Sequence, residues 1–268
     1  MTQPQEAVHS RIWEETPEPD NPFAAATCYC AGYDVYGDLL GRASWAEYLY
    51  LLFKGERPSP SQARLLENLA VALANPGPRE ASVHAAMCGG TGGSTHASSL
   101  MAALAVGAGQ LGGAHEVALA VAGWQSCGMD LAAWRERLQN PPEGDIDVWP
   151  PMEHPPGFDP HGAGCATPVR QTLAKLKESG NSDALAWLYE QRPALEALAG
   201  HPLSMSGVAA AALFDLGMDS DQAEMLYLLL RLPGAAVHAL EQKEYGWRRF
   251  PFFAGGLKLV DDPGPKQV

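Results

Sequence analysis

The sequence predicts an almost wholly α-helical protein, and two kinds of observation lead to this fold class. The first is a recurrence of helix-start signals, among them capping boxes in which a serine or aspartate precedes a Glu or Gln by three residues. Four such starts are expected, at Ser44, Ser59, Thr167 and Asp219. The second is hydrophobic patterning: segments 208–216 and 225–230 are apolar on every side, which predicts central, buried helices. Strand signals hardly occur.

The remaining elements follow in chain order. The acidic, proline-rich N-terminus predicts an exposed arm, and it lacks the basic and apolar regions of a signal peptide. Segment 100–119 is rich in Ala and Gly, so its helix backbones can approach closely, as they do at some dimer seams. A helix is expected from Asp130 to Leu138. Residues 140–164 contain seven prolines and predict an irregular connection.

The length, net charge and composition of the chain limit which functions are possible. A chain of 268 residues can bury a large core without disulfides, as one large domain or as a large domain with a small satellite. A net charge of -13 opposes a nucleic-acid partner, because phosphate binding needs positive charge. The five irregularly spaced cysteines predict reduced thiols and a cytoplasmic location. The longest apolar stretch is interrupted by Gly and polar residues, so no membrane segment or membrane partner is expected.

Two local patterns suggest chemistry that the spacing does not support. The eight histidines form no ligand spacing with Cys or carboxylates, so no metal is expected. The glycine-rich segment 88–99 lacks the lysine of a phosphate-binding loop and follows no predicted strand. It predicts a tight turn between packed helices.

Three segments carry a resemblance to a known family. Segment 201–242 contains Pro-Leu-Ser-Met-Ser-Gly, an apolar helix, and Arg-x-x-Gly-x-x-x-His-x-Leu-Glu-Gln. It resembles the active-site segment of the citrate synthase and citryl-CoA lyase superfamily. Segment 31–62 is similar to the N-terminal block of that family, and Leu111–Ala118 (LGGAHEVA) to its His-Gly-Gly-Ala-Asn-Glu element. Leu111 replaces the first histidine, which is also absent from citryl-CoA lyase and from the lyase module of ATP-citrate lyase.

The resemblance covers the chain from about Tyr29 to Pro251 and implies its architecture. The implied fold is an all-α, citrate-synthase-like bundle with an N-terminal arm over 1–28 and a large helical domain over 29–140 and 201–268. A small helical domain with the proline-rich active-site loop would occupy 141–200. In this family two subunits build each site, so a homodimer or a dimer of dimers is implied.

The implied activity is that of a citryl-CoA lyase-like or citrate synthase-like enzyme. Such an enzyme makes or breaks the carbon–carbon bond between an acyl-CoA and a 2-oxo acid such as oxaloacetate. A coenzyme A thioester and a small carboxylate would be the substrates, with no tightly bound cofactor.

Ser206 stands where the family has its catalytic aspartate. A serine hydroxyl is too weak a base for this chemistry unless another base activates it. His161 lies one residue later than the family histidine that polarises the substrate carbonyl, and an extra loop proline can absorb this shift, so a functional His161 is favoured over a solvated loop histidine. His161, His115 and His84 are the candidate substitute bases, and Ser206, His161 and His115 are the candidate catalytic residues.

Four residues are candidates for substrate binding. Arg231 matches an arginine that grips a substrate carboxylate, a task that suits the guanidinium fork. Arg249 lies in the C-terminal region from which a family arginine can reach the neighbouring subunit, and Arg170 keeps an approximate Pro-x-Arg pattern. His84 falls where lyase relatives also have a histidine. The alternatives are surface ion pairs for the arginines and a helix histidine bound to a neighbouring carbonyl.

Changes at Pro76, Leu111 and Ser206, with the shifted His161, support a second hypothesis. The chain could be a catalytically inactive relative that binds CoA or a carboxylate, or a subunit of a larger assembly. A third hypothesis is related chemistry on a different acyl-CoA.

Overall fold

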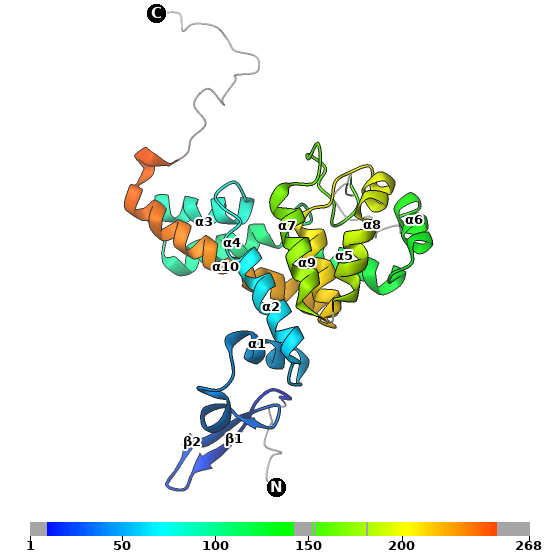
Figure 1. Ribbon diagram of the computed structural model, residues 1–268. Helices are drawn as coiled ribbons and strands as arrows, with labels where there is room; N and C mark the ends of the chain where they lie inside the picture. Colours follow the sequence, from blue (N-terminus) through cyan, green and yellow to red (C-terminus); the bar gives the residue numbers. More distant parts are fainter. Residues whose placement is uncertain (1–9, 142–151, 153, 181, 251–268) are drawn as a thin grey trace, which may run out of the picture.

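Helices dominate the computed structural model, which describes residues 10–141, 152, 154–180 and 182–250. The α-helices are α1 (Trp45–Lys54), α2 (Pro60–Leu73), α3 (Ala81–Thr91), α4 (His96–Gly107), α5 (Ala114–Cys127), α6 (Leu131–Gln139), α7 (Thr167–Leu176), α8 (Asp183–Ala199), α9 (Met205–Asp215) and α10 (Ser220–Tyr245). Short helical turns are η1 (Val35–Leu39), η2 (Lys177–Ser179) and η3 (Trp247–Arg249). The predicted helical fold class is confirmed (Figure 1).

The predicted helix starts are found where the capping signals lie. Ser44, Ser59 and Asp219 each form a complete capping box, in which both reciprocal hydrogen bonds are present. Helix α7 begins at Thr167 with a proline in its first turn, and Asp130 caps α6. The glycine-rich segment forms the end of α3 and a turn before α4, as predicted.

Three strands precede the helices, although the sequence shows few strand signals. β1 (Glu14–Glu18), β2 (Asn21–Cys30) and β3 (Tyr33–Asp34) form an antiparallel sheet in the order β1-β2-β3. Pro17 lies in the edge strand β1, where the register with β2 shifts on both sides of it. Proline weakens strand prediction from sequence, yet an edge strand can accommodate it because one side of its backbone needs no partner.

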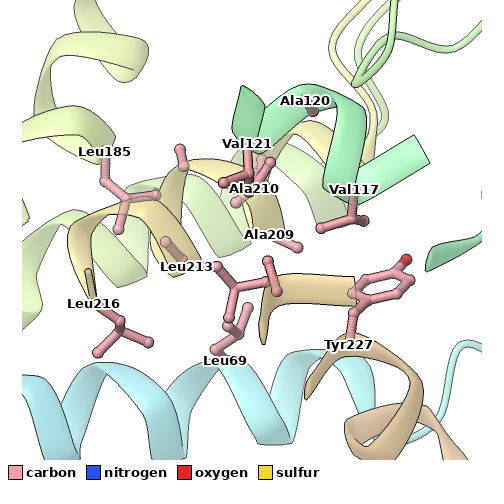
Figure 2. Packing of buried hydrophobic residues seen from close by; sticks show 14 of the residues in the cluster. Leu69, Val117, Ala120, Val121, Leu185, Ala209, Ala210, Leu213, Leu216 and Tyr227 are labelled. Atoms are coloured by element: carbon pink, nitrogen blue, oxygen red, sulfur yellow. The ribbon is translucent and has the colours of Figure 1, made fainter. Parts of the chain in front are cut away.

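The main core surrounds α9. Its residues from Val208 to Leu213 are fully buried, which confirms that segment 208–216 is a central helix. Figure 2 shows α2, α5 and α10 around it, with Leu69, Val121 and Tyr227 directed towards its small alanines. Alanine on this face lets the neighbouring helices pack closely against the α9 backbone.

The segment 225–230 differs from its prediction, because α10 is buried on one side only. Leu226 and Leu230 belong to the core, whereas Met225 and Leu229 are 56% and 41% exposed. Positions four apart share one helix face, so these two residues form part of an uncovered apolar stripe. By length and composition α10 could cross a membrane, but core helices of other proteins pass the same test.

A second apolar cluster joins α3, α4 and the C-terminal half of α10, which lie together on the left of Figure 1. Small residues set the distances between these helices. A side chain at Gly90 would collide with the carbonyl oxygen of Ala239. The backbone N–H of Gly234 donates to the Ala74 carbonyl at 2.7 Å, where α10 passes the end of α2. These contacts hold the middle of α10 against the loop that follows α2.

Helices α7 and α8 come from the segment predicted to form the small domain. Their residues Val169, Leu173 and Leu185 share one apolar cluster with α2, α5 and α9. This shared core does not test where one domain ends and the other begins, so the domain boundaries stay a prediction. Much of the proline-rich connection, residues 142–151, lies outside the described residues.

The Asp215 carboxylate caps α8, and its burial generates a prediction about pH. It accepts hydrogen bonds from the backbone N–H groups of Ala184 (2.9 Å) and Leu185 (3.0 Å). Burial raises its pKa from 3.8 to about 6, despite the opposing effect of these hydrogen bonds. A carboxyl group with a raised folded-state pKa favours folding while it is protonated. Its contribution is present below pH 3.8 and is lost as the pH rises through about 6.

We therefore expect Asp215→Asn to become progressively more stable relative to wild type between pH 4 and 7. The expected change is about 1 to 2 kcal/mol, since partial exposure screens the charge. Urea unfolding across this pH range measures it, with the exposed Asp38→Asn as the control that should show no such trend. A difference that does not vary with pH would contradict the prediction.

Candidate active site

A buried carboxylate, that of Glu116, lies where three segments of the site meet. Its side chain belongs to the first turn of α5, and the residue is 1% exposed. Oε1 accepts from Ser206 Oγ at 2.6 Å and from the Gly157 backbone N–H at 2.9 Å. Oε2 accepts from the Gly112 backbone N–H at 2.5 Å. Glu116 therefore joins the loop before α5, the end of the proline-rich loop and the start of α9.

Ser206 is oriented by hydrogen bonds on both sides. Its Oγ lies 2.6 Å from Ser204 Oγ, and Ser204 caps α9 by accepting from the Gly207 backbone N–H. The Ser206 hydroxyl donates its hydrogen to Glu116 Oε1, so it accepts the hydrogen bond from the Ser204 hydroxyl. At 3% exposure, Ser206 is a buried member of a hydrogen-bonded chain that ends at Glu116.

Two glycines seat the proline-rich loop on α9. The Ser204 backbone N–H donates to the Gly157 carbonyl at 3.1 Å, and Gly157 has a φ of +89°, which favours glycine. A side chain at Gly207 would collide with the Gly157 carbonyl oxygen and lie 2.8 Å from Leu203 Cδ1. The close approach of these two backbones brings Gly157 within reach of Glu116.

His154 completes this buried cluster. Its Nε2 lies 3.9 Å from Glu116 Oε2, and both side chains are 2% exposed. Among the described residues this Nε2 has no hydrogen-bond partner. In a serine nucleophile triad the histidine lies between serine and carboxylate, whereas here Glu116 lies between Ser206 and His154. The arrangement argues against Ser206 as a nucleophile.

Arg231 lies next to this cluster and is linked to it through Gly112. Its Nη1 donates to the Gly112 carbonyl at 3.1 Å, and its Nη2 lies 2.6 Å from Glu80 Oε1. Burial acts to raise the pKa of Glu80, but Arg231 and hydrogen bonds from Ser82 and Val83 outweigh it and lower the pKa overall. The Arg231 guanidinium also lies over the Tyr227 ring at 4.9 Å. Burial raises the pKa of Tyr227 to about 12, so this phenol stays protonated.

The three histidines predicted as substitute bases form no hydrogen bond or ion pair with Ser206 among the described residues. His115 points to α10, with Nδ1 3.6 Å from Glu224 Oε2. His161 is exposed, and its backbone N–H donates to Asp159 Oδ1 at 2.9 Å. His84 lies on α3 with its ring centroid 5.2 Å from that of Phe250. Their proposed roles stay predictions, because no hydrogen bond or ion pair of the described residues joins them to Ser206.

The two remaining arginines lie elsewhere on the described surface. Arg170 is exposed on α7, where its Nη2 donates to Thr167 Oγ1 at 3.0 Å. It lines a groove of about 460 Å³ with Tyr189 and Arg192 of α8. Arg249 is exposed at the end of the described chain, 5.8 Å from the Tyr245 ring. Of the predicted binding residues, only Arg231 is joined to the Glu116 cluster.

Leu111, which replaces the first histidine of the family element, is exposed and not packed within the chain. A leucine at the position of the family histidine can only pack, yet Leu111 is 74% exposed within this chain.

The described residues contain no group of three or more His, Cys, Asp or Glu side chains that could hold a metal ion.

No role was assigned from the sequence to Glu116 or His154, although Glu116 matches the glutamate of the family's His-Gly-Gly-Ala-Asn-Glu element. Glu116 had a usable signal, because it is the only acidic residue in the otherwise apolar helix α5. A lone carboxylate on a buried helix must find donors, so it marks a place where other segments converge. His154 had no comparable signal, since its burial depends on the folding of an irregular loop.

The overall fold of this chain is shared with solved structures of a citryl-CoA lyase and of two ATP citrate lyases. The citryl-CoA lyase from Hydrogenobacter thermophilus has this fold at 17% sequence identity, with a TM-score of 0.71 over 98% of both chains. The ATP citrate lyase from Methanothrix soehngenii, in complex with citrate and coenzyme A, matches at 19% identity and a TM-score of 0.70. A mutant of the Methanosaeta concilii ATP citrate lyase, in complex with (3S)-citryl-CoA, matches at 17% identity and a TM-score of 0.69.

The alignment covers this whole chain but 43% of each ATP citrate lyase. No protein-family model matches the sequence, and a search of curated proteins finds no match. At these identities the comparisons establish the fold, and the predicted family resemblance is confirmed at that level.

The contact between Ser206 and Glu116 predicts that restoring the family aspartate alone is harmful. Ser206→Asp would place two carboxylates within hydrogen-bond distance in a buried site, and they could not both ionise. We expect a loss of about 3 kcal/mol at pH 7 in urea unfolding, with a smaller loss at pH 5. The double variant Ser206→Asp/Glu116→Gln should regain only part of the stability: it removes the repulsion between two carboxylates, but the amide nitrogen that donates to Asp faces the Gly157 backbone N–H. A single variant as stable as wild type would contradict this account.

Proposed function

We propose that this protein is an enzyme that makes or breaks the carbon–carbon bond between an acyl-CoA and a carbonyl compound. A 2-oxo acid such as oxaloacetate is the carbonyl compound that the family resemblance suggests. Support comes from the fold shared with a citryl-CoA lyase and from the relatives solved with coenzyme A, citrate or citryl-CoA. A coenzyme A thioester is accordingly the proposed substrate.

The observation on which this proposal depends is the 2.6 Å contact between Ser206 Oγ and Glu116 Oε1. Serine alone cannot replace the family aspartate, but a serine hydrogen-bonded to a carboxylate can pass a proton to it. Glu116 would be the base and Ser206 the group that relays the proton. In this proposal the basic carboxylate lies on α5 and not on α9, and it acts on the substrate through the hydrogen bond to Ser206.

The relay accounts for both proton transfers of a cleavage reaction, the removal of a proton from the 3-hydroxyl and the addition of one to C2. Ser206 Oγ takes the proton of the substrate 3-hydroxyl while its own proton passes to Glu116. The C2–C3 bond breaks, C3 becomes the carbonyl carbon, and the electron pair enters the thioester enolate. The proton on Glu116 then returns through Ser206 to C2, which releases the acyl-CoA and the carbonyl compound. In synthesis the same steps run in reverse, starting with removal of a proton from C2 of the acyl-CoA.

Turnover is tested with purified protein and a panel of 3-hydroxyacyl-CoA thioesters that includes citryl-CoA, with CoA species followed by mass spectrometry. Acetyl-CoA with oxaloacetate tests the reverse direction. We expect cleavage of at least one thioester. Absence of turnover with the whole panel, in both directions, would contradict the enzyme hypothesis. Calorimetry with CoA and citrate would then test the alternative of an inactive binding protein.

The relay itself is tested by Glu116→Gln and Ser206→Ala. We expect each variant to lower kcat by a factor of about 10² or more, since general acid–base catalysis is typically worth that much. Binding of CoA should be retained, because neither change removes a positive charge. The exposed Glu136→Gln, which makes the same charge change on α6, is the matched control. A Glu116→Gln enzyme with wild-type kcat would rule out the relay.

We also propose that a second copy of the chain covers the apolar stripe of α10 and the adjoining surface. Large apolar side chains are exposed on α10, and further ones are exposed on α4 and in the loop between α4 and α5. They are Met101, Val106, Leu111, Met225, Leu229, Val237 and Leu240. The loop residue Leu111 adjoins Gly112, so this surface extends to the candidate site. Exposed apolar stripes of this kind are typical of subunit interfaces.

Light scattering of the wild type should therefore give at least twice the 28.5 kDa mass of one chain. The double variant Leu229→Lys/Val237→Lys should lower the mass towards that of a monomer, because it places charge in the stripe. Val71→Lys is the control, as it makes a similar change on the exposed face of α2. A monomeric wild type at micromolar concentration would contradict the proposal.

A further inference from the structure

Arg231, the residue expected to grip a substrate carboxylate, is already bound to a carboxylate of its own chain. Nη2 contacts Glu80 Oε1 at 2.6 Å, and Nη1 donates to the Gly112 carbonyl at 3.1 Å. The side chain is 7% exposed, and its guanidinium also lies over the ring of Tyr227. The two Nη groups that a bidentate carboxylate would use are therefore engaged by different acceptors.

Glu80 is held in this position by a second set of bonds. It is the N-cap of α3, and its Oε2 accepts from the backbone N–H groups of Ser82 (3.0 Å) and Val83 (3.1 Å) and from the Ser82 hydroxyl. One carboxylate therefore caps a helix with one oxygen and binds Arg231 with the other. A substrate carboxylate could displace Glu80 from Arg231 only by also disturbing the start of α3.

Three imidazoles around the site also face carboxylates of the chain. His154 faces Glu116 at 3.9 Å, His115 faces Glu224 at 3.6 Å, and His238 faces Glu241 at 3.4 Å. Glu224, Arg231 and His238 follow one another at seven-residue intervals, which places them along one face of α10. Four carboxylates thus stand against one guanidinium and three imidazoles, so the formal charge of this group is at most zero. A single Arg249 contributed by a second copy would add one positive charge.

We propose that Glu80 occupies the place of a substrate carboxylate and thereby selects thioesters whose carbonyl-forming part is uncharged. The substrate class is a 3-hydroxyacyl-CoA with alkyl groups on C3, cleaved to an acyl-CoA and a neutral aldehyde or ketone. This inference depends on the proposed function, of which it specifies the substrate. A citrate-like acyl group would bring two further negative charges to a group whose one guanidinium is already bound to Glu80.

The wild-type enzyme tests this with three thioesters that share the reaction but differ in charge. Citryl-CoA has two acyl carboxylates, citramalyl-CoA has one, and 3-hydroxy-3-methylbutyryl-CoA has none. We expect kcat/KM to rise in that order, by about tenfold or more from first to last. If citryl-CoA is cleaved at least as efficiently as the neutral thioester, this inference is wrong while the proposed function stands. If none is cleaved and the wider panel also fails, the proposed function is wrong.

Glu80→Gln tests the assigned residue. The amide oxygen can still cap α3, while the charge of Arg231 is no longer neutralised. We expect the ratio of kcat/KM for citryl-CoA to that for the neutral thioester to rise by about tenfold or more. Glu178→Gln makes the same charge change at an exposed pair with Lys175 and should leave the ratio unchanged. An unchanged ratio in Glu80→Gln would overturn the assignment.

Binding of free citrate gives a readout that needs no turnover. Calorimetry should show that the Glu80→Gln variant binds citrate about tenfold or more tightly than the wild type, because Arg231 is released. Equal affinity in the two proteins would contradict the role of Glu80, whichever thioester the enzyme cleaves.

Discussion

The burial of the Glu116 carboxylate is the constraint on which the candidate site depends. A carboxyl group at 1% exposure is tolerated only with hydrogen-bond partners around it, and here the donors come from Gly112, Gly157 and Ser206. These donors belong to the loop before α5, the end of the proline-rich loop and the first turn of α9. Satisfying one charge therefore fixes three segments relative to one another, and the glycine contact between Gly157 and Gly207 lets them come close enough.

A second buried charge extends the same logic to the rest of the molecule. Arg231 links α10 to the start of α3 through Glu80 and to the Glu116 cluster through Gly112. The substitutions relative to the family pattern are then connected. In the proposed relay, Glu116 of α5 supplies the carboxylate missing at Ser206, and the arginine retained on α10 is paired within the chain. Two glutamates organise the site: Glu116, which the family element also carries, and Glu80, and their contacts are the physical basis for proposing altered specificity over loss of activity.

Much of the fold could be predicted, because its signals are local. Capping boxes marked the starts of α1, α2 and α10, and continuous apolarity marked α9 as the central helix. The N-terminal strands were missed because prolines in an edge strand hide the usual pattern. The exposed face of α10 was missed because apolarity alone does not say how many neighbours a helix has. Of the site, Ser206 and Arg231 were identified, whereas their partners Glu116 and Glu80 were not.

The sequence by itself determined the helical elements, the identity of the central helix and the family that the chain resembles. These depend on residues a few positions apart, where caps, periodicity and motifs act. Only the tertiary structure decided which groups meet in the site. Ser206 and Glu116 are 90 positions apart, and Gly157 and Glu116 are 41 apart. Hydrogen bonds of less than 3 Å between such distant positions depend on how whole helices pack, and no local pattern encodes that packing.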